Sequence, residues 1–460
     1  MCNKVRSIYL VEYGRNIYTE ERGYGKTDLC WLYPQLLTKA YKWSSLLRMD
    51  VLKKIKHPDD EITPLLYCAW NHMSERFKNI VLSEDPIVSI TSRASKIAAT
   101  DRGFIRSDIG QVIGILPDYE VYYGPTIGKI ALRELVAEFW STFYKLDHLT
   151  YENVAVTTGA TEALFLLFSI FGYGRKVILM SPHWPTFPDT IRKAGSDYVR
   201  FELVDEDGAF RIDELESLIK STHINVMLVN SPNNPSGIAL EPQNMEQLAE
   251  LAERYNMIII SDEVYNRIRY RGEPDTMLRY APDRTVVVTS ASKEYLIPGL
   301  RVGFVISKSK TLTDVIIKKL LRCQSSCPNT AGQDVVMEIM KREVDELKGN
   351  KEPSFITPIV EELKNRRDAI ADALTEVGCK IFGNRPPDGT IFTFAKIPET
   401  VDLSDKEFIG KAMDLHLFSA IPGSACGKPG WLRFSFGNLS LEDISQLKDN
   451  LQKFLYMIGG

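Results

Sequence analysis

Short apolar runs recur through the middle of the chain, and segments with helical spacing lie between several of them. The runs that predict strands are 153–157, 176–180, 198–203, 224–230, 257–260, 286–288 and 302–306. The segments that predict helices are 130–140, 161–171 and 245–255. Strands that are apolar on both faces and alternate with helices are typical of a mostly parallel α/β sheet.

The hydrophobic pattern changes beyond a predicted helix near 311–323. A long helix is predicted at about 357–377, and alternating apolar and polar residues predict strands at 390–397 and 431–436 with helices around them. An alternating pattern indicates strands with one buried and one exposed face. The end of the chain therefore predicts a separate, smaller α+β domain.

Residues 1–95 have the least regular pattern. Tyrosine and tryptophan are frequent there, which argues against a disordered tail, and the apolar positions within 46–55 fit one face of an amphipathic helix. We expect a helical extension packed on the main body. Three roles stay open for it: a lid, an oligomer contact or simple surface cover.

Composition and charge exclude several classes of protein. Hydrophobic residues make up 44% and charged residues 25% of the chain, and the net charge is −4, so neither a nucleic-acid partner nor a membrane is expected. The seven cysteines and six histidines are scattered without a metal-binding set. The odd cysteine count and the polar start without an apolar core predict reduced thiols in the cytoplasm.

Polar or glycine-rich clusters follow four of the predicted strands. They are Thr157–Thr161, Ser231–Gly237, Ser261–Tyr265 and Ser290–Arg301. In open α/β sheets the ligand binds outside the carboxyl ends of the strands. We therefore expect the four clusters to meet at one crevice.

The residues in these clusters suit one chemistry. Lys293 beside an apolar strand end is a candidate imine-forming amine, and Arg301 can bind a phosphate group with two hydrogen bonds. Asp262 ends an apolar strand, where its charge needs a cation such as a protonated pyridine nitrogen. Singly, each has a plainer interpretation: a surface lysine, a helix N-cap or an ordinary turn. Together they predict a pyridoxal 5′-phosphate site.

At these motifs the chain resembles the class I/II aminotransferases of pyridoxal-phosphate fold type I, from about residue 96 to the end. The resemblance implies an α/β fold with a mostly parallel, seven-stranded type of sheet in a large domain and a smaller α+β C-terminal domain. It divides the chain into an N-terminal arm with part of the small domain (96–145), a large cofactor-binding domain (146–345) and a C-terminal small domain (346–460).

The resemblance also implies a role for each matching residue around the cofactor. Lys293 would be the Schiff-base lysine and proton shuttle, and Asp262 would pair with the ring nitrogen. Asn234 and Tyr265 would bind the ring hydroxyl, which makes Lys293, Asp262 and Tyr265 the catalytic set. The residues implied to bind the phosphate are Gly159, Ala160, Thr161, Ser290 and Arg301.

Four further residues are implied to complete the site. Trp184 would stack on the cofactor ring, and Tyr123 would reach the phosphate of the neighbouring subunit in a homodimer. Arg433 would bind the substrate α-carboxylate. Gly110, in Ile109-Gly110-Gln111, resembles the start of the substrate-facing arm and is a candidate substrate-binding residue.

The chain departs from the family where substrate recognition is expected. Residues 112–122, eleven positions, separate Gln111 from Tyr123, which is too few for the helix that usually precedes this tyrosine. About 95 residues precede the arm. The resemblance therefore predicts the cofactor chemistry without identifying the substrate.

We expect an aminotransferase that acts on an α-amino acid, a small-molecule substrate, through Schiff-base chemistry. A same-fold enzyme without transamination is the alternative: β- or γ-elimination or replacement, cyclisation of the aminocyclopropane-carboxylate synthase kind, or carbon–carbon bond formation, with S-adenosylmethionine-type substrates included. A third hypothesis is a catalytically silent regulator. Lys293 is present and no DNA-binding module is recognisable, which weighs against that hypothesis.

Overall fold

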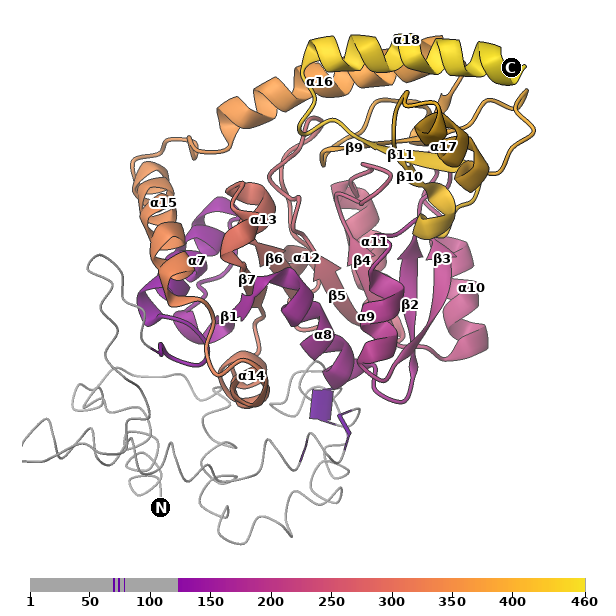
Figure 1. The fold of residues 1–460 in the computed structure, drawn as a ribbon. Coiled ribbons are helices and arrows are strands. Elements are labelled where there is room, and N and C mark those ends of the chain that lie inside the picture. The colour runs from indigo at the N-terminus through magenta and orange to yellow at the C-terminus, as the bar shows by residue number, and fades with distance from the viewer. Residues whose placement is uncertain (1–68, 71–72, 75–77, 79–122, 460) are drawn as a thin grey trace, which may run out of the picture.

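The computed structural model describes residues 69–70, 73–74, 78 and 123–459 (Figure 1). Nearly all of the predicted helical extension (1–95), and the arm up to residue 122 with Gly110, lie outside the described residues. The fold below is that of the described part of the chain.

A seven-stranded sheet forms the centre of the larger part of the molecule, in the order β1-β7-β6-β5-β4-β2-β3 (Figure 1). Its strands are β1 (Val154–Thr158), β2 (Lys176–Ser181), β3 (Asp197–Glu202), β4 (Val226–Asn230), β5 (Ile258–Asp262), β6 (Thr285–Ser290) and β7 (Val302–Ile306). Strand β7 is antiparallel to both β1 and β6, whereas β3, β2, β4, β5 and β6 run parallel. The prediction of a mostly parallel seven-stranded sheet is confirmed.

Helices cover both faces of this sheet, and β5 shows why its strands are apolar throughout. Ile258 and Ile260 belong to one buried cluster and Ile259 to the cluster on the opposite face. The helices of this part are α7 (Ile130–Phe143), α8 (Gly159–Phe171), α9 (Phe187–Lys193), α10 (Ile212–Thr222), α11 (Pro242–Arg254), α12 (Met277–Tyr280), α13 (Ala291–Glu294), α14 (Lys318–Gln324) and α15 (Thr330–Lys348). A strand between two helical layers needs apolar residues on both sides.

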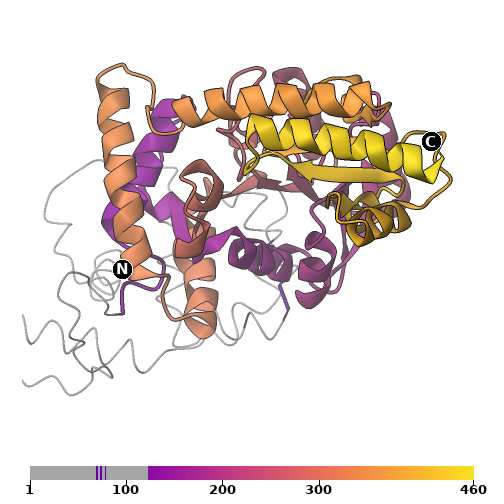
Figure 2. The same cartoon turned by 45° about the horizontal axis from the view of Figure 1, so that its top comes forward.

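A smaller four-stranded antiparallel sheet follows in the order β10-β11-β9-β8. Its elements are α16 (Thr357–Glu376), β8 (Lys380–Ile381), β9 (Phe392–Lys396), α17 (Asp405–Asp414), β10 (Ile421–Pro422), β11 (Trp431–Ser435) and α18 (Leu441–Ile458). Helices α16 and α18 lie side by side over it (Figures 1 and 2). Its core also includes Tyr265 and Ile268 from the larger part, so the two sheets are joined by apolar packing.

Several helices depart from the predicted pattern, and two of them are long enough to matter for the packing. The helix predicted near 311–323 begins as a π-helix at Leu312–Ile317 and continues as α14. Helix α15 was not among the predicted elements, although Val336, Met340 and Val344 are buried at a helical spacing of four residues. It packs along α7, as both views show (Figures 1 and 2). None of the described helices is long and apolar enough to span a bilayer.

Candidate active site

The carboxyl ends of β4, β5 and β6 lie next to one another. In the parallel register, Asn230 is opposite Asp262, and Asp262 is opposite Val288. Ser290, two residues further along β6, pairs with Gly303 of β7. The polar residues at these strand ends are therefore neighbours because ladder hydrogen bonds hold adjacent strands about 5 Å apart.

Asp262 is a buried carboxyl group, with 4% of its surface exposed. Its Oδ1 accepts a hydrogen bond from the Val264 N–H at 3.3 Å, and its backbone oxygen accepts one from Asn230 Nδ2 at 3.0 Å. Burial raises the pKa of Asp262 to about 7, and none of the ion pairs among the described residues includes it. No helix begins at this point, so the geometry suits a partner cation better than a helix cap.

Lys293 lies in the short helix α13, directly after β6, and is half-buried. Burial lowers the pKa of Lys293, and the positive charges of Arg433 and Arg301 lower it further. Its Nζ lies 5.7 Å from the centroid of the Tyr265 ring. An amine with a lowered pKa is neutral more often near pH 7, and only the neutral form can act as a nucleophile or base.

Tyr265 connects the lysine to the smaller sheet. The side chain is 4% exposed, and burial raises the pKa of its hydroxyl group, with a further contribution from the negative charge of Asp262. Its ring packs edge-on against Phe392, with the centroids 5.9 Å apart. The tyrosine is therefore held neutral at the contact between the two parts of the molecule.

Arg301 lies against the first turn of α8. Gly159 has φ +76°, and a Cβ added there would lie 2.3 Å from Arg301 Nη2. Gly303 is equally close, because its added Cβ would lie 2.4 Å from the Gly159 carbonyl carbon. Ala160 and the exposed Thr161 continue this turn. The N–H groups of the turn and the guanidinium group of Arg301 can together bind an anion.

Arg433 reaches the same region from β11 of the smaller sheet. Its Nη1 donates to Asn234 Oδ1 at 3.0 Å, and its guanidinium lies 4.4 Å from the centroid of the Phe392 ring. Asn234 is held in turn by its N–H, which donates to Asn230 Oδ1 at 2.8 Å. The Nε of Arg433 is buried without a hydrogen-bond partner among the described residues, and burial lowers the pKa of the guanidinium.

Two predicted residues stand apart from these contacts. Trp184 is half-buried in the turn after β2 and packs edge-on against Phe187 at 5.4 Å. Tyr123 is 71% exposed at the start of the continuous described segment. Gly110 lies outside the described residues, so its predicted role stays a prediction.

Two residues that the motifs did not indicate help to build the site. Asn230 forms hydrogen bonds to both Asp262 and Asn234. It is a polar residue at the end of an apolar run, and this feature of the sequence could have indicated it. Phe392 packs against the Arg433 guanidinium. Its position depends on the register of β9 and β11, in which Arg433 is directly opposite Phe394, two residues after Phe392. Such a diagonal contact across two strands has no counterpart in the sequence pattern.

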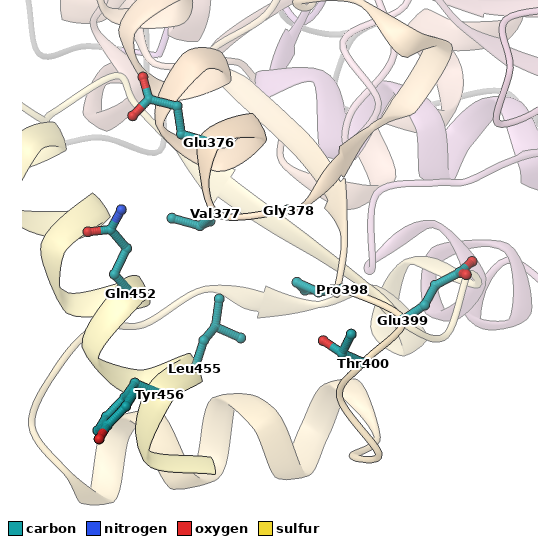
Figure 3. Close-up of a pocket in the computed structure, with 9 residues that line it drawn as sticks. All are labelled: Glu376, Val377, Gly378, Pro398, Glu399, Thr400, Gln452, Leu455 and Tyr456. Carbon is teal, nitrogen blue, oxygen red and sulfur yellow. The ribbon is translucent and has the colours of Figure 1, made fainter. Parts of the chain in front are cut away.

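A surface hollow of about 560 Å³ lies elsewhere, between the end of α16, the segment after β9 and α18 (Figure 3). It is lined by Glu376, Val377, Gly378, Pro398, Glu399, Thr400, Gln452, Leu455 and Tyr456. None of the predicted site residues lines it, so we place the candidate active site at the strand ends.

Pyridoxal phosphate fits the residues at the strand ends. Asp262 is a buried carboxyl that needs a cation, Lys293 is an amine with a lowered pKa, and Arg301 beside Gly159 forms an anion cradle. When bound, this cofactor supplies an aldehyde that combines with amines and a ring that withdraws electrons from the reacting carbon. The charged groups around it would come from the protein.

Comparison with known proteins agrees with this fit. The family "Aminotransferase class I and II" matches residues 120–451. The aspartate aminotransferase of Thermotoga maritima is 30% identical over 351 residues, covering 75% of this chain and 87% of that protein. The aromatic-amino-acid aminotransferase 2 of Thermococcus litoralis is 26% identical over 345 residues, covering 73% of this chain and 84% of that protein.

Solved structures show the same architecture. The aspartate aminotransferase of Thermotoga maritima superposes with a TM-score of 0.65 at 27% identity, covering 84% of this chain and all of that one. The aromatic aminotransferase of Pyrococcus horikoshii gives 0.65 at 25% identity, with 73% of this chain and 88% of that one. The chain belongs to the class I and II aminotransferase family and is a pyridoxal-phosphate-dependent aminotransferase of fold type I.

Proposed function

We propose that Lys293 is the catalytic base of this aminotransferase and that Asp262 is its electrostatic partner. The observation that carries this proposal is the placement of two groups beside adjacent strand ends: a buried carboxyl without an ion-pair partner among the described residues and a half-buried amine with a lowered pKa. Lys293 Nζ, once neutral, accepts the proton from the substrate α-carbon. Asp262, ionised against the ring nitrogen, keeps that nitrogen protonated.

The substrate in this proposal is an α-amino acid held by its carboxylate at Arg433. A guanidinium binds a carboxylate with two parallel hydrogen bonds, and Arg433 has a buried Nε without a partner among the described residues. Asn234 and Phe392 fix the plane of this guanidinium. The relatives are named for aspartate, prephenate and aromatic amino acids, so acidic and aromatic donors are the first to test.

Isotope transfer tests this function. The holoenzyme is incubated with ¹⁵N-labelled aspartate, phenylalanine, alanine or methionine and unlabelled 2-oxoglutarate, and ¹⁵N-glutamate is measured by mass spectrometry. Label transfer from at least one donor is expected. Consumption of a donor with release of its side-chain group or of ammonia, and without labelled glutamate, would favour elimination instead.

We also propose a homodimer in which Tyr123 contributes to the neighbouring subunit's phosphate site. Its 71% exposed side chain and the 49% exposed Leu296, three residues from Lys293, support a shared surface. Co-expressed Tyr123→Ala and Lys293→Ala subunits give mixed dimers. These should hold one intact site and exceed the summed activity of the two parent variants, whereas a monomer in sedimentation experiments contradicts the proposal.

A further inference from the structure

Thr390 adopts a backbone conformation that threonine rarely takes. It lies just before β9, is completely buried and has φ +69°. Among the described non-glycine residues with positive φ, it is the one with a branched Cβ. The left-handed region costs such a residue free energy, so the conformation persists only where the surroundings enforce it.

The larger part of the molecule enforces it through two hydrogen bonds. The Thr390 N–H donates to the Ile268 carbonyl oxygen at 3.0 Å, and its own carbonyl oxygen accepts from the Tyr270 hydroxyl at 2.6 Å. The preceding residue is in close contact too, since a Cβ on Gly389 would lie 2.6 Å from the Ile268 oxygen. Thr390 is therefore fixed to the segment that continues from Asp262 and Tyr265.

A third hydrogen bond links Thr390 to Phe392. The Phe392 N–H donates to Thr390 Oγ1 at 3.1 Å, which sets the first residue of β9. The Phe392 ring then lies 4.4 Å from the Arg433 guanidinium and 5.9 Å from the Tyr265 ring. One aromatic ring thus touches the proposed carboxylate-binding group and the buried tyrosine.

We infer that Thr390 is a positioning residue for substrate binding. Its strained backbone and its Oγ1 hold Phe392 against Arg433, and so aim the guanidinium at an incoming carboxylate. This inference rests on the proposed function, because it takes Arg433 as the group that binds the substrate carboxylate. The ligand class concerned is any α-amino acid or carboxylate analogue that reaches Arg433.

Three substitutions of Thr390 separate the contributions of its hydroxyl acceptor, its branched side chain and its backbone conformation. Thr390→Ser keeps the hydroxyl acceptor. Thr390→Val keeps the branched shape and removes the acceptor. Thr390→Gly also removes the acceptor. Glycine adopts a φ of +69° without strain, but it does not restrict φ to that value.

The test measures binding and stability apart from turnover. Calorimetry gives the Kd of 3-phenylpropionate, a carboxylate without an amino group, for each holoenzyme, and thermal unfolding gives the Tm of each apoprotein. One buried hydrogen bond corresponds to a change of about three- to tenfold in Kd. We expect Thr390→Val and Thr390→Gly to raise Kd by that factor, Thr390→Ser to stay within about twofold, and Thr390→Gly to retain its Tm.

Arg433→Lys in the same titration separates the two proposals. If it weakens 3-phenylpropionate binding and the Thr390 variants do not, the inference is overturned and the proposed function stands. If Arg433→Lys leaves the Kd unchanged, the carboxylate role of Arg433 is itself wrong. The inference is also overturned if all three Thr390 variants lose the same amount of Tm and their affinity for 3-phenylpropionate falls in proportion. Thr390 would then only stabilise the fold.

Discussion

The proposed cofactor side and the proposed carboxylate side of the site are built in different ways. On the cofactor side, Asp262 ends β5 and Lys293 follows the adjacent strand β6, and ladder hydrogen bonds set the spacing of these two strands. On the carboxylate side, Arg433 comes from a second sheet and meets Asn234 through one hydrogen bond of 3.0 Å. Backbone pairing therefore determines the first half, whereas packing between two sheets determines the second.

The difference has an energetic side. Moving Asp262 relative to Lys293 would break several backbone hydrogen bonds of the sheet, while moving Arg433 relative to Asn234 loses one charged hydrogen bond. The cofactor side should thus respond to substitution by losing catalysis or cofactor binding, and the carboxylate side by losing affinity for the substrate. Four substitutions test this division.

Lys293→Ala should have the largest effect, because it removes the proposed proton acceptor. We expect label transfer to fall by at least about a thousandfold. Lys293→Arg is the matched control, since it keeps the positive charge but cannot release its proton. Comparable activity in the arginine variant would rule out proton transfer by this side chain.

Asp262→Asn should change both activity and the pH dependence of apoprotein stability. The pKa of Asp262 is raised to about 7 in the folded state, so only the unfolded chain ionises between about pH 4 and pH 7 and stability falls as pH rises through that window. The contribution of this group is about 4 kcal/mol at most.

Urea unfolding of both apoproteins at intervals from pH 5 to pH 8 measures this contribution. The fall should be shallower in Asp262→Asn, although Glu263 and Glu294, whose pKa values burial raises to about 7 and about 8, act in the same direction. Identical slopes for the two proteins would show that Asp262 is ionised throughout this window.

Arg433→Lys should act on the carboxylate side alone. Loss of the bidentate contact between the guanidinium and the substrate carboxylate should raise KM for the amino acid by about thirtyfold and change kcat by only a few fold. Arg342→Lys is the control, because this exposed residue makes a surface ion pair with Glu346. A fall in kcat with unchanged KM would contradict the division.

Gly159→Ala should give the smallest effect on the cofactor side. The new Cβ would crowd Arg301, so the affinity for pyridoxal phosphate should fall by about tenfold, measured by fluorescence titration of the apoprotein. Gly174→Ala shares the positive φ but has no atom within 4 Å of the added Cβ. Both variants should lose some stability; equal loss of cofactor affinity in the two would contradict a specific role for Gly159.

Much of the fold followed from local patterns. Apolar runs such as 257–260 predicted β5 because a strand between two layers of helices must be apolar on both faces. Lys293 and Asp262 were found because polar residues at the ends of such strands are conspicuous. The left-handed Thr390 could not be predicted, since threonine itself disfavours that conformation and only the contacts with Ile268 and Tyr270 impose it.

The sequence alone indicated the strands of the larger sheet and pointed to Lys293, Asp262 and Arg301 as candidate site residues, because these depend on residue type and on neighbours within a few positions. Tertiary structure decided how Arg433 is aimed. Its guanidinium is held by Asn234 and Phe392, which are 199 and 41 positions away in the chain. The contact with Phe392 exists only after β9 and β11 have paired, and the contact with Asn234 only after the smaller sheet has packed against the larger part, so no local pattern encodes either.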